Sequence, residues 1–180
     1  QSEVLLWQLQ YLPTVIWMDL SLELCSVNEG ANLNCGSVVY EPQSLEYLKG
    51  FPQSGPADGK IASANGQFGG FLDQQSSVRW AKTDITSGPL LMDWTYTAPH
   101  STDGWSYYMT KPGWDQNAPL ERSGFEKIAT VTHDGSKAFT NPDHVIDIPA
   151  NRNGYHVILA VWDIADTVNA FYNVIDVNVD

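Results

Sequence analysis

The side chains of this sequence best suited to binding a metal or moving a proton are its four histidines, His100, His133, His144 and His156. None of them lies at the spacing of a close ligand pair such as HxH or HxxxH, so spacing alone gives little support for a zinc site. We expect His156, in an apolar run, to be buried and hydrogen-bonded, and His133, before an Asp-Gly turn, to be solvated. His100 follows directly on a strand-like run, and a histidine at the end of a rigid strand is a candidate metal ligand.

Two carboxylates, Asp163 and Asp166, form a second candidate group after an apolar run. Aspartates in such a position commonly cap turns, and they can equally form a polar rim beside a pocket. Their distance in space is not readable from the sequence, so they cannot be assigned as the paired carboxylates of a glycosidase. The sequence also has no Gly-x-Ser-x-Gly elbow, phosphate loop or dinucleotide fingerprint.

Alternating apolar and polar residues predict the strands that must position these side chains. We expect strands over residues 89–98, 105–110, 126–133, 144–150, 155–164 and 170–180. Their lengths and the Gly, Pro, Asn and Asp residues between them indicate an all-β fold, an antiparallel β-sandwich. Residues 40–80 are dense in Gly and Pro and predict a long insertion, with helical character only around 44–48.

The acidic charge balance limits the classes of partner. The sequence has 180 residues, which suits one domain, and its formal net charge is −12. Nucleic acids and anionic membrane surfaces are therefore disfavoured, whereas a neutral polysaccharide is compatible. The apolar first residues are interrupted by Glu3, Pro13 and Asp19 and contain no Lys or Arg, so they suit neither a membrane span nor a signal peptide.

The two cysteines of the sequence, Cys25 and Cys35, lie close together among Gly and Asn residues. This spacing indicates a short disulfide loop, and the alternative is a pair of free thiols in a cytosolic protein. A disulfide places the protein outside the reducing cytosol, so we expect a secreted protein.

Six long motifs of the sequence are "CGSVVYEPQSLE" (35–46), "GFPQSGPADGKIASA" (50–64), "LDQQSSVRW" (72–80), "TAPHSTDGW" (97–105), "YYMTKPGWDQNAPL" (107–120) and "IPANRNGYHVILAVWDIADTVNAFYNVIDVNV" (148–179). In these motifs and in their order along the chain, the sequence resembles bacterial chitin-active lytic polysaccharide monooxygenases, also called chitin-binding type-4 domains or auxiliary activity family 10. The resemblance implies a fibronectin-like or immunoglobulin-like β-sandwich with a partly helical insertion, and a monomer that acts on crystalline chitin with an external electron donor. It also implies one copper ion in a histidine brace, in which the first residue of the mature chain and a second histidine supply three nitrogen ligands.

The resemblance also assigns site residues. His100 matches the second brace histidine, Ala98 the small residue at one axial side of the copper, and Phe171 the aromatic residue at the other. Glu46 matches the acidic residue near the oxidant channel. The residues that match the flat chitin-facing patch are Tyr40, Glu41, Pro42, Gln43, Asp166 and Asn169.

Residues 1–24 do not match the family, whereas residues 25–180 match a chitin-binding type-4 domain. Residue 1 is Gln, and no histidine precedes His100. We therefore expect this chain to bind chitin without cleaving it, and to bind copper weakly or not at all. Three explanations remain open: residues 1–24 are a frameshift or gene-model artefact, the protein is a binding-only relative, or the chain is engineered or truncated. A function of another class, a non-catalytic carbohydrate-binding module or an adhesin, also remains open.

Overall fold

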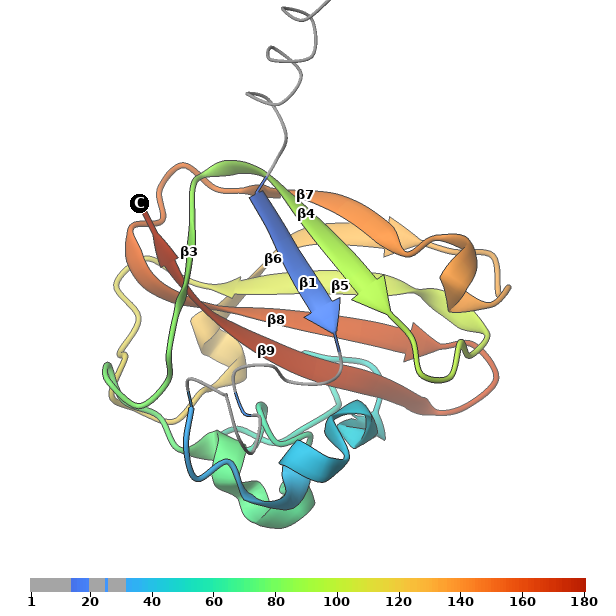
Figure 1. The fold of residues 1–180 in the computed structure, drawn as a ribbon, viewed down its shortest axis with the longest axis horizontal. Helices are drawn as coiled ribbons and strands as arrows, with labels where there is room; N and C mark the ends of the chain where they lie inside the picture. The colour runs from blue at the N-terminus through green and yellow to red at the C-terminus, as the bar shows by residue number, and fades with distance from the viewer. Residues whose placement is uncertain (1–13, 20–24, 26–31) are drawn as a thin grey trace, which may run out of the picture.

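The computed structural model describes residues 14–19, 25 and 32–180, with only the backbone described for 14–19. Two sheets face each other in it, as Figure 1 shows. The smaller sheet has the order β1 (Thr14–Asp19), β4 (Gly88–Thr95) and β7 (Asp143–Ile148). The larger sheet has the order β2 (Glu46–Leu48), β9 (Asn169–Val179), β8 (Gly154–Ile164), β5 (Thr102–Thr110) and β6 (Phe125–Thr132), and β3 (Thr83–Ile85) also pairs with β9.

This arrangement confirms the predicted all-β sandwich and places the six predicted strands in it as β4 to β9. Most strand pairs are antiparallel, but β1 with β4 and β3 with β9 run parallel. The predicted domain boundary after residue 24 falls beside residues 20–24, which lie outside the described residues. That boundary stays a prediction.

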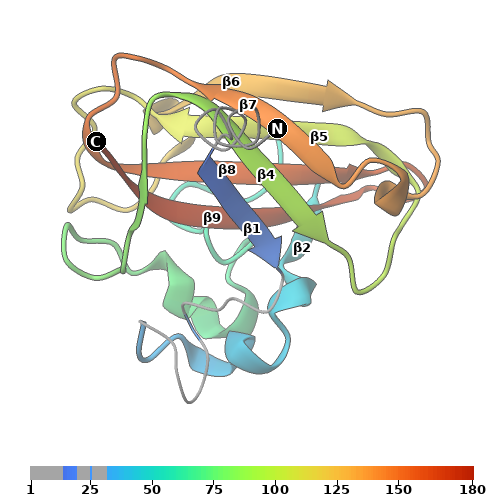
Figure 2. The ribbon, with the colours of Figure 1, turned by 45° about the horizontal axis from the view of Figure 1, so that its top comes forward.

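Burial explains the sequence pattern of the strands. On β4 the side chains of Leu90, Met92 and Trp94 point into the sandwich, and those between them point outward, which gives the alternation. β8 is buried on both faces because the smaller sheet covers one and the insertion covers the other, so its sequence is almost continuously apolar. In Figures 1 and 2 the insertion, coloured cyan to green, lies along one side of the sandwich next to β9.

The insertion contains short 3₁₀ helices and one short strand. Its helical turns are η2 (Gly36–Tyr40), η3 (Pro42–Ser44) and η4 (Gln67–Asp73). The prediction of helical character over 44–48 holds at Ser44, the last residue of η3, and is wrong for residues 46–48, which pair with β9 as the strand β2. The main chain of the preceding Leu45 is also bonded to β9, since its carbonyl accepts a hydrogen bond from the Tyr172 amide at 2.9 Å.

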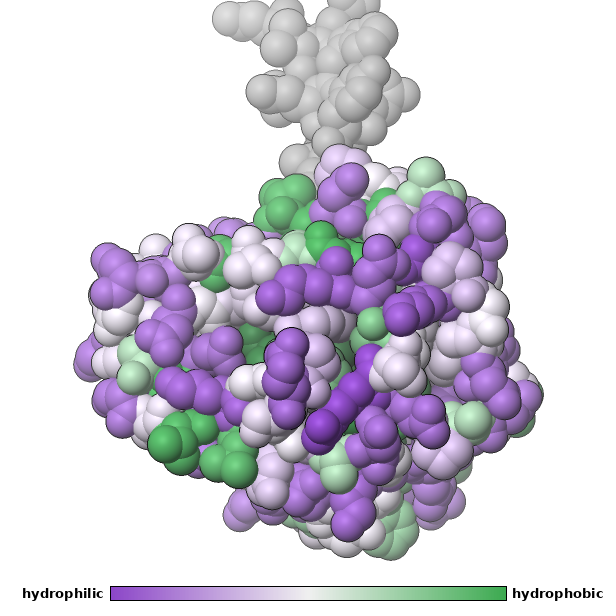
Figure 3. Space-filling view, turned by 180° about the vertical axis from the view of Figure 1, so that it is seen from behind, coloured by the Kyte–Doolittle hydropathy of each residue, from purple (hydrophilic) through white to green (hydrophobic). Residues whose placement is uncertain are grey.

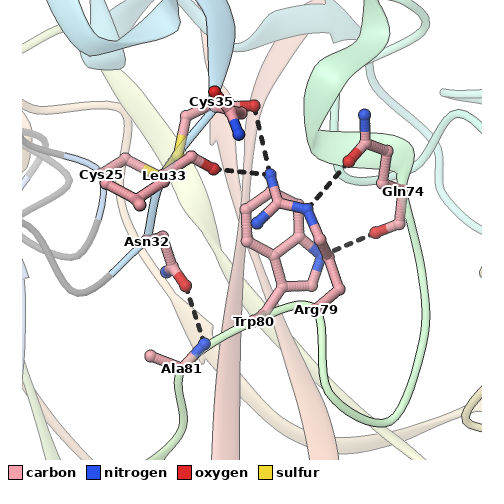
Figure 4. The surroundings of a disulfide bond; sticks show 9 residues. Cys25, Asn32, Leu33, Cys35, Gln74, Arg79, Trp80 and Ala81 are labelled. Carbon is pink, nitrogen blue, oxygen red and sulfur yellow. Dashed lines mark hydrogen bonds between the residues drawn. A yellow bond between two sulfur atoms is a disulfide. The ribbon is translucent and has the colours of Figure 1, made fainter.

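The predicted disulfide between Cys25 and Cys35 is confirmed, with the two Cα atoms 6.0 Å apart. Figure 4 shows the disulfide loop joined to the second half of the insertion by Arg79. The Arg79 guanidinium donates to the carbonyls of Leu33 (2.8 Å) and Asn34 (3.1 Å) and lies 3.7 Å from the ring centroid of Trp80. These contacts fix the segment that leads into the predicted chitin-facing patch.

The polar surface agrees with the negative mean hydropathy of the sequence. Figure 3 shows the face opposite that of Figure 1, on which polar residues predominate and hydrophobic residues form only small separate areas. Within the described residues, no helix has the length and apolar character needed to cross a membrane.

Candidate functional site

His100 lies in the loop between β4 and β5, with its imidazole exposed at one end of the sandwich. Hydrogen bonds hold the main chain of the loop in place at this residue. The His100 amide donates to the carbonyl of Ala98 (2.9 Å), and the His100 carbonyl accepts from the Ala138 amide (3.1 Å) and the Thr102 hydroxyl (2.9 Å). The sequence predicts a strand that runs to residue 98 and ends next to His100, but β4 ends at Thr95. His100 therefore lies in a loop rather than at a strand end, and hydrogen bonds fix the main chain there.

Two aromatic rings lie against the inner side of this imidazole. Trp162 on β8 and Phe171 on β9 are register partners, and their ring centroids are 4.9 Å apart. The His100 ring lies nearly parallel to Phe171 at 5.8 Å and tilted toward Trp162 at 5.7 Å. The three rings thus contact one another where the two sheets meet at the end of the sandwich.

A cavity of about 230 Å³ opens beside these rings. It brings together the four predicted residues Glu46, Ala98, His100 and Phe171, which come from three distant segments of the chain. The remaining lining residues are Gln43, Ser44, Thr97 and Trp162. The cavity is therefore a mixed polar and aromatic hollow with one imidazole and one carboxylate.

The carboxylate of Glu46 is held by an amide. Glu46 on β2 is the register partner of Phe171, and the Asn169 side-chain amide donates to the Glu46 carboxylate at 2.6 Å. Asn169 was predicted as part of the chitin-facing patch, and the structure shows that its side-chain nitrogen is bonded to Glu46. It therefore orients the carboxylate that lines the cavity.

The other predicted patch residues differ in exposure. The side chain of Tyr40 is 73% exposed, and Glu41 and Asp166 are exposed as well. Pro42 is buried and begins η3, so it shapes the turn rather than offering a surface. Gln43 lines the cavity, so the residues free to meet a large ligand are Tyr40, Glu41 and Asp166.

Three sequence predictions outside the cavity have mixed outcomes. His156 is buried and its Nδ1 is 2.7 Å from the Thr110 hydroxyl, as expected for a satisfied histidine. The prediction that His133 is solvated is wrong, because its side chain is only 10% exposed and lies against Trp105. Asp163 does not line the cavity; burial raises the pKa of its carboxyl, and nearby Lys49 opposes that rise.

Two residues of the site were missed by sequence reasoning. Trp162 lies in the apolar run of β8, where nothing distinguishes it from a core residue. Lys49 donates to the carbonyl of Ile164 (2.6 Å) and to the Asp103 carboxylate (3.3 Å), which fixes the start of the loop that carries Asp166. Both residues contact segments far from them in the sequence, so local sequence does not reveal these contacts.

The described residues fit a copper site only in part. In residues 25 and 32–180, no group of three His, Cys, Asp or Glu side chains is placed to hold a metal ion. His100 supplies a single imidazole, whereas nitrogen chelation by several ligands is what binds copper tightly. The described residues thus place one imidazole ligand, that of His100, beside two aromatic rings and one carboxylate.

Comparison with known sequences gives a family match over most of the chain. Residues 21–177 match the family model described as "Lytic polysaccharide mono-oxygenase, cellulose-degrading". The chain is 52% identical over 154 residues to the GlcNAc-binding protein A of Shewanella oneidensis, covering 83% of this chain and 32% of that protein. It is 48% identical over 158 residues to the lytic chitin monooxygenase of Enterococcus faecalis, covering 86% of this chain and 77% of that protein. The chain thus spans about a third of the length of the GlcNAc-binding protein.

Solved structures give the same match in three dimensions. The catalytic domain of a lytic polysaccharide monooxygenase from Listeria monocytogenes superposes with a TM-score of 0.82 at 54% identity, covering 88% of this chain and 94% of that one. A "CBM33" protein from Bacillus amyloliquefaciens in complex with Cu(I) superposes with a TM-score of 0.80 at 56% identity, covering 81% and 84%.

Proposed function

Because the chain belongs to the lytic polysaccharide mono-oxygenase family, we propose that it is a secreted protein that binds crystalline chitin through the end of the sandwich that carries His100. The observation that carries the proposal is the cavity lined by Glu46, Ala98, His100 and Phe171. It is supported by the exposed ring of Tyr40, which is close in sequence to the lining residue Gln43. The family description names cellulose, but the relatives named for GlcNAc binding and for chitin favour chitin.

The exposed residues suit a polysaccharide. The ring of Tyr40 can stack on a sugar ring, and the carboxylates of Glu41 and Asp166 can accept hydrogen bonds from hydroxyl and N-acetyl N–H groups. Chitin is uncharged, so the formal net charge of −12 on the protein does not oppose its binding.

We propose further that this chain binds chitin without cleaving it. Copper, when bound by a full set of nitrogen ligands, supplies the oxidative chemistry of the family. Of the four histidines in the sequence, the cavity lining includes His100, and this single imidazole supports the proposal. With a second histidine arm, His100 would complete the ligand set, Phe171 and Ala98 would limit access around the ion, and the Glu46 carboxylate would hold or release a proton in the cavity.

Binding is tested by sedimentation with β-chitin. We expect Tyr40→Ala to weaken binding about fivefold, because a stacked aromatic contact contributes about 1 kcal/mol beyond its area. Val145→Ala is the matched control, since Val145 is exposed at 63% but lies on β7 in the smaller sheet. Equal binding of the Tyr40→Ala variant and the wild type would contradict the proposed face.

The absence of cleavage is tested separately. Calorimetric titration with Cu(II) should show weak binding that His100→Ala removes. Mass spectrometry of β-chitin treated with the protein, a reductant and copper should show no oxidised oligosaccharides. Tight copper binding together with aldonic-acid products from this chain would overturn the binding-only proposal.

A further inference from the structure

The Thr102 hydroxyl lies at the junction of the elements that surround His100. Thr102 is the first residue of β5 and is 0% exposed. Its hydroxyl donates to the His100 carbonyl at 2.9 Å and accepts a hydrogen bond from the Trp162 indole N–H at 2.8 Å. A hydroxyl has one donor hydrogen, so this geometry uses it on His100 and leaves an oxygen lone pair for Trp162.

The main chain of Thr102 is fixed as well. Its amide donates to the carbonyl of Ser136 (3.0 Å), and its carbonyl accepts from the amide of Gly135 (2.9 Å). The branched side chain restricts rotation about its first torsion angle, so the hydroxyl has little freedom once the main chain is set. The hydroxyl is therefore a rigid link between two groups on different strands.

The two residues that the Thr102 hydroxyl joins, His100 and Trp162, also contact each other through their side-chain rings. Trp162 contacts both the imidazole of His100 and the ring of Phe171, and its own ring is almost completely buried at 1% exposure. We infer that Thr102 is a positioning residue: by bonding the His100 main chain and the Trp162 indole, it sets where the imidazole lies relative to the two rings. Its importance for function rests on the proposed role of His100, but the geometric link does not.

Loss of the hydroxyl has a defined consequence. In Thr102→Val, which has nearly the same shape, the Trp162 indole N–H is buried without an acceptor, and the His100 carbonyl keeps only the Ala138 amide. A buried donor without a partner is unfavourable, so the indole or the loop must move to find one. Thr102→Ser keeps the hydroxyl and should keep the arrangement.

The test is NMR spectroscopy of the full chain at one fixed pH. We expect nuclear Overhauser effects between the His100 ring protons and the rings of Trp162 and Phe171 in the wild type and in Thr102→Ser, and none in Thr102→Val. We also expect exchange of the Trp162 indole proton to be about fivefold faster in Thr102→Val, which corresponds to about 1 kcal/mol for a lost hydrogen bond.

Thr110→Val is the matched control. Thr110 is also on β5 and 1% exposed, and its hydroxyl lies 2.7 Å from the His156 Nδ1 and accepts from the Val157 amide, at the other end of the strand. The substitution removes an equally buried hydroxyl, so general destabilisation should be similar, but the nuclear Overhauser effects of His100 should stay.

Several results would overturn the inference. One is that the Overhauser effects between the His100 ring and the rings of Trp162 and Phe171 remain in Thr102→Val. Another is that Thr110→Val loses them as well. The third is that Thr102→Ser does not show them. If Thr102→Val does not fold, the wild type and Thr102→Ser still decide, because a Trp162 indole proton that exchanges at once in the wild type excludes the hydrogen bond. None of these readouts depends on chitin, so the inference and the proposed function can fail separately.

Discussion

Asp176 is half-buried on β9, with its carboxyl group against Tyr155 beneath the insertion. Its replacement by Asn tests how partial removal from water affects stability. The Tyr155 hydroxyl donates to it at 2.5 Å, and Gln75 donates in turn to that hydroxyl at 3.0 Å. Burial raises the pKa of Asp176 from 3.8 to about 6, although the Tyr155 hydrogen bond and the nearby charge of Lys82 oppose the rise. The folded protein therefore keeps this proton more tightly than the unfolded chain does.

The sign of the pH effect follows from this. Between about pH 4 and about pH 6 the folded protein binds more protons at Asp176 than the unfolded chain, so the stability contributed by this group falls as pH rises. A pKa change from 3.8 to about 6 corresponds to about 3 kcal/mol when the group is fully ionised. Asp176→Asn has no such ionisation and keeps an oxygen acceptor for Tyr155.

Urea unfolding near pH 4 and above pH 7 measures the effect. We expect Asp176→Asn to be more stable than the wild type by up to about 3 kcal/mol at the higher pH, with a much smaller difference near pH 4. Asp147→Asn, at an exposed position on β7, controls for the loss of one negative charge from an acidic protein. Equal stabilisation by both variants, or a difference that does not change with pH, would refute the reasoning.

Three further predictions use the same unfolding assay. Burial lowers the pKa of His144 to about 4, so the stability that this residue contributes should grow as pH rises from about 4 to 6.5. If the free energy of unfolding of His144→Asn rises with pH in this range as steeply as that of the wild type, this prediction is contradicted. The double variant Cys25→Ser, Cys35→Ser should lose about 2.5 kcal/mol, and a value near zero would show that the unfolded chain gains no freedom without the disulfide. Arg79→Ala should lose about 1–2 kcal/mol through its hydrogen bonds and its contact with Trp80, and Arg79→Lys should restore only part of this loss.

The strands were predictable from the sequence because burial leaves a local pattern. The expected strand over 155–164 is found at Gly154–Ile164, and the one over 170–180 at Asn169–Val179. β2 was not predictable, because its three residues are extended only through pairing with β9, far along the chain. Propensity within residues 44–48 favoured a helical turn, and the tertiary pairing overrides it.

The site was only partly predictable, for the same physical reason. His100, Glu46, Ala98 and Phe171 follow from the family resemblance, and the cavity brings them together. Thr102 and Trp162 look like ordinary strand residues in the sequence. Their hydrogen bond to each other depends on the cross-strand register between β5 and β8, which local sequence does not encode.

The position of β9, between β8 on one side and β2 and β3 on the other, also affects how the protein folds. This strand pairs with β8 along nearly its whole length and with β2 and β3 as well, yet it is the last of the described strands to be synthesised. Its pairing with β8 is a local hairpin, but its pairing with β2 and β3 joins segments that are far apart in the sequence. Those two pairings must close long loops, which slows their formation. The cavity beside His100 needs Phe171 from this strand, so the site is incomplete on a chain whose synthesis has stopped before Asn169.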